Sequence, residues 1–235
     1  MSLLTVVQSA ARRLGIAVPT SVAGSSDVQA LQLMEFVTEE GQDLTDRYPW
    51  ARLQTEATFV TVASTLQGAM TTLASSNFQY LLNDTIWNRS KRRPIYGGLS
   101  PEEWQRFQAS PVTGPIEQFR IRGGNLYFTP IPTAGETCAF EYLSGNWCES
   151  NLGVGHDACT ADTDVFRLPE RLILLGVIWR WKRSKGLAYA EDFRLYETEV
   201  ANAQGRDAGK PRLSLDGSPT DRLPGIVVPQ GNWNL

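Results

Sequence analysis

The chain has 235 residues, of which 42% are hydrophobic and 20% charged, and its formal net charge is −3. This length and composition are typical of one large domain or two small ones with a hydrophobic core. The small net charge excludes a conventional nucleic-acid-binding protein. No run approaches the about 18 apolar residues of a membrane-spanning helix, and the first Arg pair follows the apolar residues, the wrong order for a signal peptide. We therefore expect a soluble protein made in the cytosol.

Two helices are predicted at the N-terminus. Residues 3–14 have an amphipathic pattern that Gly15 ends. A second helix is expected from a cap at Ser26 or Asp27 to about Tyr48. These helices make residues 1–50 one helical unit.

The outer face of the second predicted helix carries an acidic stripe, formed by Glu35, Glu39, Asp43 and Asp46. Such a stripe is most often a solvated helix face, and a metal-binding or catalytic cluster is the less common alternative. A third interpretation applies if the protein forms a ring around DNA. An acidic wall would then let DNA pass without sticking, because it repels the phosphates.

From Trp50 onwards the spacing of apolar residues changes from a helical to an alternating pattern. Residues 53–61 alternate, residues 118–128 form the clearest hairpin, with a glycine turn, and residues 137–144 are expected to be its returning strand. The sequence therefore predicts a small antiparallel β-domain over residues 51–147, inserted between two helical parts.

The region after the β-domain is predicted to be a loop followed by a helical hairpin. Residues 148–164 are polar and contain glycine, as loops do. Residues 165–205 indicate two helices that meet at Gly186. The first of them is apolar almost all round, which indicates burial on more than one side.

Residues 206–235 show no helical or strand periodicity, because Gly and Pro recur throughout. This tail nevertheless carries apolar residues along its length, at Leu213, Leu215, Leu223, Ile226, Val227, Val228, Trp233 and Leu235. A tail with such anchors is a candidate to dock on a neighbouring protein, often by adding a strand to a sheet. The alternative is a tail that lies on its own domain.

Catalytic signatures are missing from the sequence. It contains no phosphate-binding loop, dinucleotide fingerprint or nucleophile elbow. Its potential metal ligands beyond carboxylates are Cys138, Cys148, Cys159 and His156, whose spacing is poor for zinc. We therefore expect a protein that is not an enzyme, with no catalytic residue, cofactor or metal.

Two short basic clusters occur, at residues 88–93 and 180–185. The second falls in the last turn of a predicted helix, where positive charge suits the helix dipole. The first lies in the β-domain and could contact a partner or DNA through Arg89, Lys91, Arg92 and Arg93.

The chain resembles the head-to-tail adaptor proteins of tailed, and most closely of short-tailed, bacteriophages in three stretches: LLNDTIWNRS…RPIYGGLSPEEWQRF, FRIRGGNLYFTPIPTAGETCAFEYLSGNW and LPERLILLGVIWRWKRSKGLAYAEDFRLYE. The resemblance covers most of residues 1–205. It implies an α+β fold in which the N-terminal helices and the C-terminal hairpin form a bundle around an inserted β-domain. It also implies an extended C-terminal tail that reaches the portal.

The resemblance further implies a structural virion protein at the head–tail junction, assembled in the host cytoplasm. A closed ring of about twelve copies would join the portal to the tail or nozzle protein. Genomic DNA would pass through its lumen without sequence-specific binding, and no membrane would be involved. Ring contacts that the portal orders need not form in the free protein.

A ring gives the apolar helix of the hairpin a second surface to cover. Residues two apart on a helix point in different directions, so we expect one of two tryptophans to contact a neighbouring subunit. The predicted subunit interface comprises Trp179, Trp181 and Arg183.

Two other functions stay open from the residues alone. A glycan-binding or hydrolytic tail component is suggested by the aromatic residues of the β-domain, Trp87, Trp104, Tyr127 and Trp147, although alternating aromatics more often form a β-core. A packaging accessory that binds DNA ends is suggested by the basic cluster at residues 88–93, and its binding would be salt-sensitive.

Overall fold

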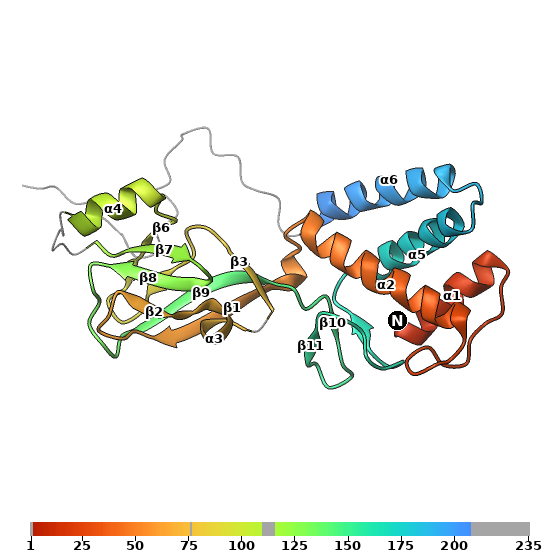
Figure 1. Ribbon diagram of the computed structural model, residues 1–235, viewed down its shortest axis with the longest axis horizontal. Helices are drawn as coiled ribbons and strands as arrows, with labels where there is room; N and C mark the ends of the chain where they lie inside the picture. The colour runs from red at the N-terminus through yellow and green to blue at the C-terminus, as the bar shows by residue number, and fades with distance from the viewer. Residues whose placement is uncertain (1, 76, 110–115, 208–235) are drawn as a thin grey trace, which may run out of the picture.

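The computed structural model describes residues 2–75, 77–109 and 116–207, which form a helical part and a β-domain side by side (Figure 1). The α+β class is confirmed. The helical part contains helices from both ends of the described chain: α1 (Leu3–Leu14), α2 (Val28–Arg47), α5 (Glu170–Ser184) and α6 (Ala190–Arg206).

Local capping explains where the first two helices begin and end. The Oγ of Ser2 accepts a hydrogen bond from the Thr5 backbone N–H (3.4 Å) at the start of α1, and Gly15 ends the helix with a φ of 69°. The carboxylate of Asp27 accepts the Gln29 N–H (3.2 Å) at the start of α2. Both helices lie where the sequence predicts them, because side-chain caps and a left-handed glycine are local signals.

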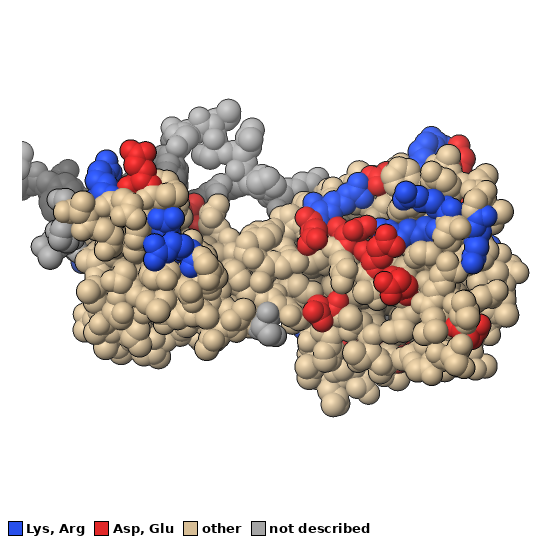
Figure 2. All heavy atoms as spheres, viewed as in Figure 1, with Lys and Arg blue, Asp and Glu red and all other residues tan. Residues whose placement is uncertain are grey.

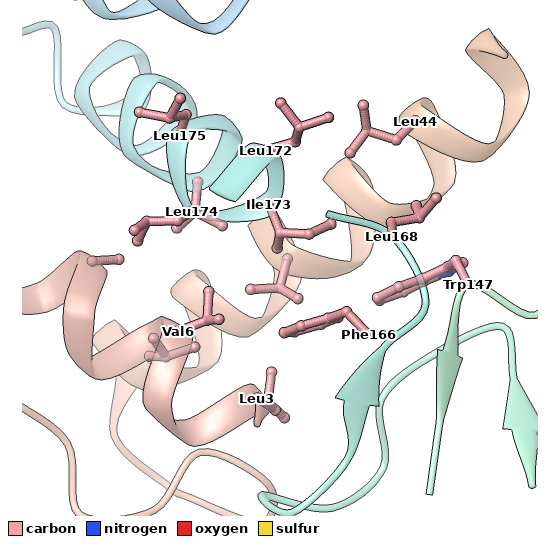
Figure 3. Packing of buried hydrophobic residues seen from close by; sticks show 14 of the residues in the cluster. Leu3, Val6, Leu44, Trp147, Phe166, Leu168, Leu172, Ile173, Leu174 and Leu175 are labelled. Carbon is pink, nitrogen blue, oxygen red and sulfur yellow. The ribbon is translucent and has the colours of Figure 1, made fainter. Parts of the chain in front are cut away.

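Helix α5 is the centre of the helical part. Ten consecutive residues, 172–181, are buried, because α1, α2 and α6 all pack against it. Figure 3 shows Leu172, Ile173 and Leu174 of α5 in one apolar cluster with Val6 of α1 and Leu44 of α2. The predicted burial of this helix on more than one side is confirmed, and it is achieved within a single chain.

Two sheets form the β-domain. The first has the strand order β1-β9-β4-β5, with β3 also paired to β9, and the second has the order β2-β8-β7-β6. The strands of the first are β1 (Gln54–Val60), β3 (Phe78–Leu81), β4 (Trp87–Asn88), β5 (Arg93–Pro94) and β9 (Thr137–Ser144). Those of the second are β2 (Leu66–Ala69), β6 (Tyr96–Gly97), β7 (Gln118–Arg122) and β8 (Asn125–Thr129). A 3₁₀ turn (Ala51–Leu53) and the helices α3 (Met70–Leu73) and α4 (Pro101–Ala109) complete it.

The two sheets share one core. The ring of Phe59 on β1 lies 6.1 Å from that of Phe128 on β8 and 6.0 Å from that of Phe140 on β9. The predicted hairpin is present as β7 and β8, which turn at Gly123 and Gly124. The sequence predicts that β9 returns beside this hairpin. In the structure β9 instead pairs with β1, along the whole length of β1.

The segment 148–164, predicted to be a loop, contains most of a small three-stranded sheet. Its strands are β10 (Cys148–Glu149), β11 (Gly155–His156) and β12 (Val165–Phe166), in the order β11-β10-β12. Strands of two residues are too short to show an alternating pattern, which is why the sequence did not reveal them. Asp162 ties the segment to the α1–α2 connection, because its carboxylate accepts the backbone N–H groups of Val22 (2.9 Å) and Ala23 (2.7 Å).

Trp147 connects the end of the β-domain to the helices. It is 1% exposed, and its ring stacks on Phe166 at 6.0 Å between the ring centroids. The indole lies directly against Gly41 of α2, where any Cβ would overlap its ring. Gly41 is therefore required by packing and not by backbone conformation.

Replacing Gly41 with alanine is expected to lower the free energy of unfolding by about 1–3 kcal/mol, the usual cost of overpacking a core. The matched control is Gly205→Ala, since Gly205 lies in α6 with nothing near its Cβ position. That change should be neutral or slightly stabilising. Urea denaturation of both variants provides the measurement, and equal stabilities of the two variants would contradict the packing assigned to Trp147.

Candidate interaction surfaces

The predicted acidic stripe lies exposed on α2, where Figure 2 shows a group of acidic side chains beside basic ones. Arg180 of α5 partly neutralises it. The Nη2 of Arg180 contacts the Asp43 carboxylate, and its Nε lies 3.6 Å from Glu39 Oε2. Asp46 accepts a hydrogen bond from Gln79 Nε2 (3.3 Å). Glu35 is exposed, and the described part of the chain offers it no ion-pair partner.

Sequence reasoning missed a fifth acid of α2, Glu40. Its side chain is fully buried and contacts Arg180 Nη1. The space for it is provided by Gly176 of α5, where a Cβ would overlap the carboxylate. Burial raises the pKa of Glu40 to about 8, although Arg180 and a hydrogen bond from Tyr196 oppose that shift. A glycine and an arginine within an otherwise apolar helix were the signals that could have revealed this pair.

The two tryptophans of the predicted subunit interface are both buried within one chain, which leaves little of either side chain for a neighbouring subunit. Trp179 and Trp181 do point in different directions, but each is only 8% exposed within one chain. Trp179 is covered by α6, with its ring 5.1 Å from that of Phe193 and 6.1 Å from that of Tyr196. Trp181 belongs to the apolar core that α5 shares with the other helices. Arg183, by contrast, is exposed and remains free for a contact.

The basic cluster of the β-domain is largely occupied by internal contacts. Lys91 Nζ lies 2.6 Å from Glu117 Oε1 and 2.9 Å from Glu136 Oε1. The hydrogen bond to Glu117 raises the pKa of Lys91. Arg89 Nη2 lies 2.7 Å from the carboxylate of Glu56.

Of the four cations in that cluster, Arg92 and Arg93 thus remain. Both are exposed, and the structure records no ion pair for them within the described residues. Two free cations are too few for the phosphate contacts that give DNA binding its strength.

The aromatic residues that suggested glycan binding do not form an exposed platform. Trp147 is 1% exposed and lies in the helical core, and Trp104 is 4% exposed. Trp104 packs on Tyr127, with 5.9 Å between the ring centroids. Trp87 lines a surface pocket, about 420 Å³ in volume, together with Arg89, and the buried Trp147 borders another of about 370 Å³. These aromatic residues therefore mainly stabilise the fold. The observation that suggested a glycan-binding or hydrolytic tail component no longer supports it.

Cys148 lies in contact with Cys159 and is paired with His156, whereas Cys138 lies apart in the core of the β-domain. All three thiols are free and buried, and burial raises the pKa of Cys138 to about 12. Cys148 donates a hydrogen bond to the His156 carbonyl (3.4 Å). Across residues 2–75, 77–109 and 116–207 no cluster of potential ligands could hold a metal ion. Over the same residues, no helix is long and apolar enough to cross a membrane.

The predicted portal-binding residues of the tail, from Leu213 to Leu235, lie outside the described residues. The last described residue is Asp207, whose carboxylate accepts the Ala51 N–H (2.8 Å) at the start of the β-domain.

The described residues form a helical part and a separate β-domain, with polar clusters that are mainly ion pairs. The family model of the SU10 adaptor protein matches residues 1–219, and the chain belongs to this family. Membership of this family indicates a phage adaptor that is part of the virion. Adaptors of this kind are structural rather than enzymatic proteins. A comparison with curated proteins finds no match.

Proposed function

We propose that this chain is the subunit of a ring-shaped adaptor that joins the portal of a short-tailed phage to its tail or nozzle. The observation that carries the proposal is the family match over residues 1–219, which spans both the helical part and the β-domain. About twelve copies would close the ring, and the ring would extend the DNA channel at the head–tail junction.

The two parts of the molecule suit different tasks in such a ring. The helical part, with α5 held on three sides, is a rigid wall element, and the β-domain lies to one side of it (Figure 1). The proposal assigns the wall to the helices and places the β-domain outward or toward the tail. Genomic DNA would pass without sequence-specific binding.

The channel-lining role of Glu35, Glu39, Asp43 and Asp46 stays a prediction. Arg180 neutralises part of the charge of this stripe, so it repels phosphate less than four free carboxylates would. The face that these acids occupy is open to another neighbour, which is considered below.

The proposal is tested by mixing the purified protein with portal rings of the same phage. Sedimentation should show the chain moving with the portal, and an added tail or nozzle protein should join only when the chain is present. If the tail protein joined bare portal rings equally well, the adaptor role would be contradicted.

Removing the tail after Asp207 is expected to weaken binding to portal rings at least about tenfold, which corresponds to about 1.4 kcal/mol. The apolar anchors of residues 208–235 would be lost, while α6 and the contact between Asp207 and Ala51 would stay. Binding is measured by sedimentation of labelled chains with portal rings. A full-length control with Gly205→Ala should bind as the unchanged protein does, and undiminished binding of the shortened chain would exclude the tail as the portal anchor.

A further inference from the structure

A groove between α1 and the start of α5 carries unpaired positive charge. It has a volume of about 450 Å³ and is lined by Ser9, Arg12, Arg13, Glu170, Arg171 and Leu174. Arg12 and Arg13 are exposed, and within the described part of the chain no acidic group pairs with either. Arg171 is held by Glu199 at 3.3 Å. We call this surface the α1/α5 groove.

A ridge of opposite character stands on α2. Val28 is 77% exposed and Leu31 is 46% exposed, and Glu35 and Glu39 follow on the same face at helical spacing. The ridge therefore begins with two apolar side chains and continues with two carboxylates, of which Glu39 is partly neutralised by Arg180. We call Val28, Leu31, Glu35 and Glu39 the α2 ridge.

We propose that the α2 ridge of one copy docks in the α1/α5 groove of the next copy. The free carboxylate of Glu35 would meet the guanidinium groups of Arg12 and Arg13. Val28 and Leu31, which are exposed in the single chain, would lose their contact with water. Charge complementarity selects the second copy as the occupant, because one chain carries both an apolar-acidic ridge and a basic groove.

Such a contact can be repeated from copy to copy, as a ring requires. When the ridge of each copy meets the groove of the next, the contact is heterologous, and each added copy leaves one free ridge and one free groove. Heterologous contacts end only when a ring closes or else continue as a filament. This inference rests on the ring proposed above, for which it supplies the subunit interface that the two tryptophans do not.

Charge reversal on each surface tests the contact. Arg12→Glu with Arg13→Glu changes the groove, Glu35→Arg changes the ridge, and Arg106→Glu is the control, since Arg106 is exposed on α4 in the β-domain. We expect the groove and ridge variants each to weaken self-association on portal rings at least about tenfold, because like charges then face each other. The combined variant should recover most of the loss, and the control should assemble as the unchanged protein does.

Two measurements keep the outcomes apart. Thermal unfolding checks that each variant is folded, and binding of single copies to the portal is measured separately from the number of copies per ring. Leu31→Asp gives a second variant that leaves the core untouched and should also weaken association. If the groove and ridge variants formed complete rings, the proposed contact between ridge and groove would be wrong, but the proposal of a ring would be kept. If the unchanged protein bound the portal without associating, both the contact and the ring would fail.

Discussion

Replacing Arg180 with methionine is expected to lower the free energy of unfolding by about 1–3 kcal/mol, the cost of leaving a buried polar group without its hydrogen-bond partner. Arg180 is 5% exposed and contacts the carboxylates of Glu40 and Asp43. Its guanidinium also lies over the ring of Trp179, with its Cζ 4.6 Å from the centroid. Methionine fills part of the volume but leaves Glu40 buried without a cation.

Substitution of Glu40, the residue that Arg180 contacts, provides the control for this prediction. Glu40→Gln should cost much less than Arg180→Met, because the carboxyl group of Glu40, with a pKa of about 8, already holds its proton at pH 7 for most of the time. The amide keeps the shape and leaves Arg180 paired with Asp43. Urea denaturation at pH 7 measures both variants. Equal losses of unfolding free energy in the two variants would contradict the expected difference between them. An Arg180→Met variant as stable as the unchanged protein would show that the contact between Arg180 and Glu40 is not needed for stability.

The free energy of unfolding should also fall as the pH rises through the range in which the Glu40 carboxyl is protonated in the folded chain but ionised in the unfolded chain. The folded pKa is about 8 and the unfolded value is near 4.5, so the folded state holds a proton that the unfolded state has released. The contribution of Glu40 is therefore greatest below about pH 4.5 and is lost as the pH approaches 8, at about 1.4 kcal/mol per pH unit.

Comparison with Glu40→Gln isolates this contribution from the other carboxylates. The difference in unfolding free energy between the two proteins, measured by urea denaturation from pH 5 to pH 8, should change in favour of the glutamine variant as the pH rises. A difference that stayed constant across this range would mean that Glu40 has an ordinary pKa in the folded protein.

Most of the secondary structure could be predicted from the sequence, since the helices and long strands have local signals. Gly15, Asp27 and Gly186 mark helix boundaries, and the alternation around Phe119 marks the β-hairpin. The pairing of β9 with β1 could not be predicted, because it joins residues about eighty positions apart. The two-residue strands after residue 147 leave no periodic trace at all.

The interaction surfaces were predicted less well, because a sequence does not show which charges neutralise each other. Lys91 appeared to be part of a basic patch, and only the fold brings it to Glu117 and Glu136. Glu40 was not singled out from the sequence, and only the fold buries it against Arg180. Trp179 and Trp181 point in different directions, as predicted, but α6 covers Trp179.

Electron microscopy of the protein mixed with portal rings of the same phage tests the central claim most directly. The account predicts a collar of about twelve copies on one face of the portal, continuous with its channel, with the helical parts in contact and the β-domains away from the portal. Portal rings without a collar, or with scattered single copies, would contradict the claim that this chain is a ring-forming adaptor.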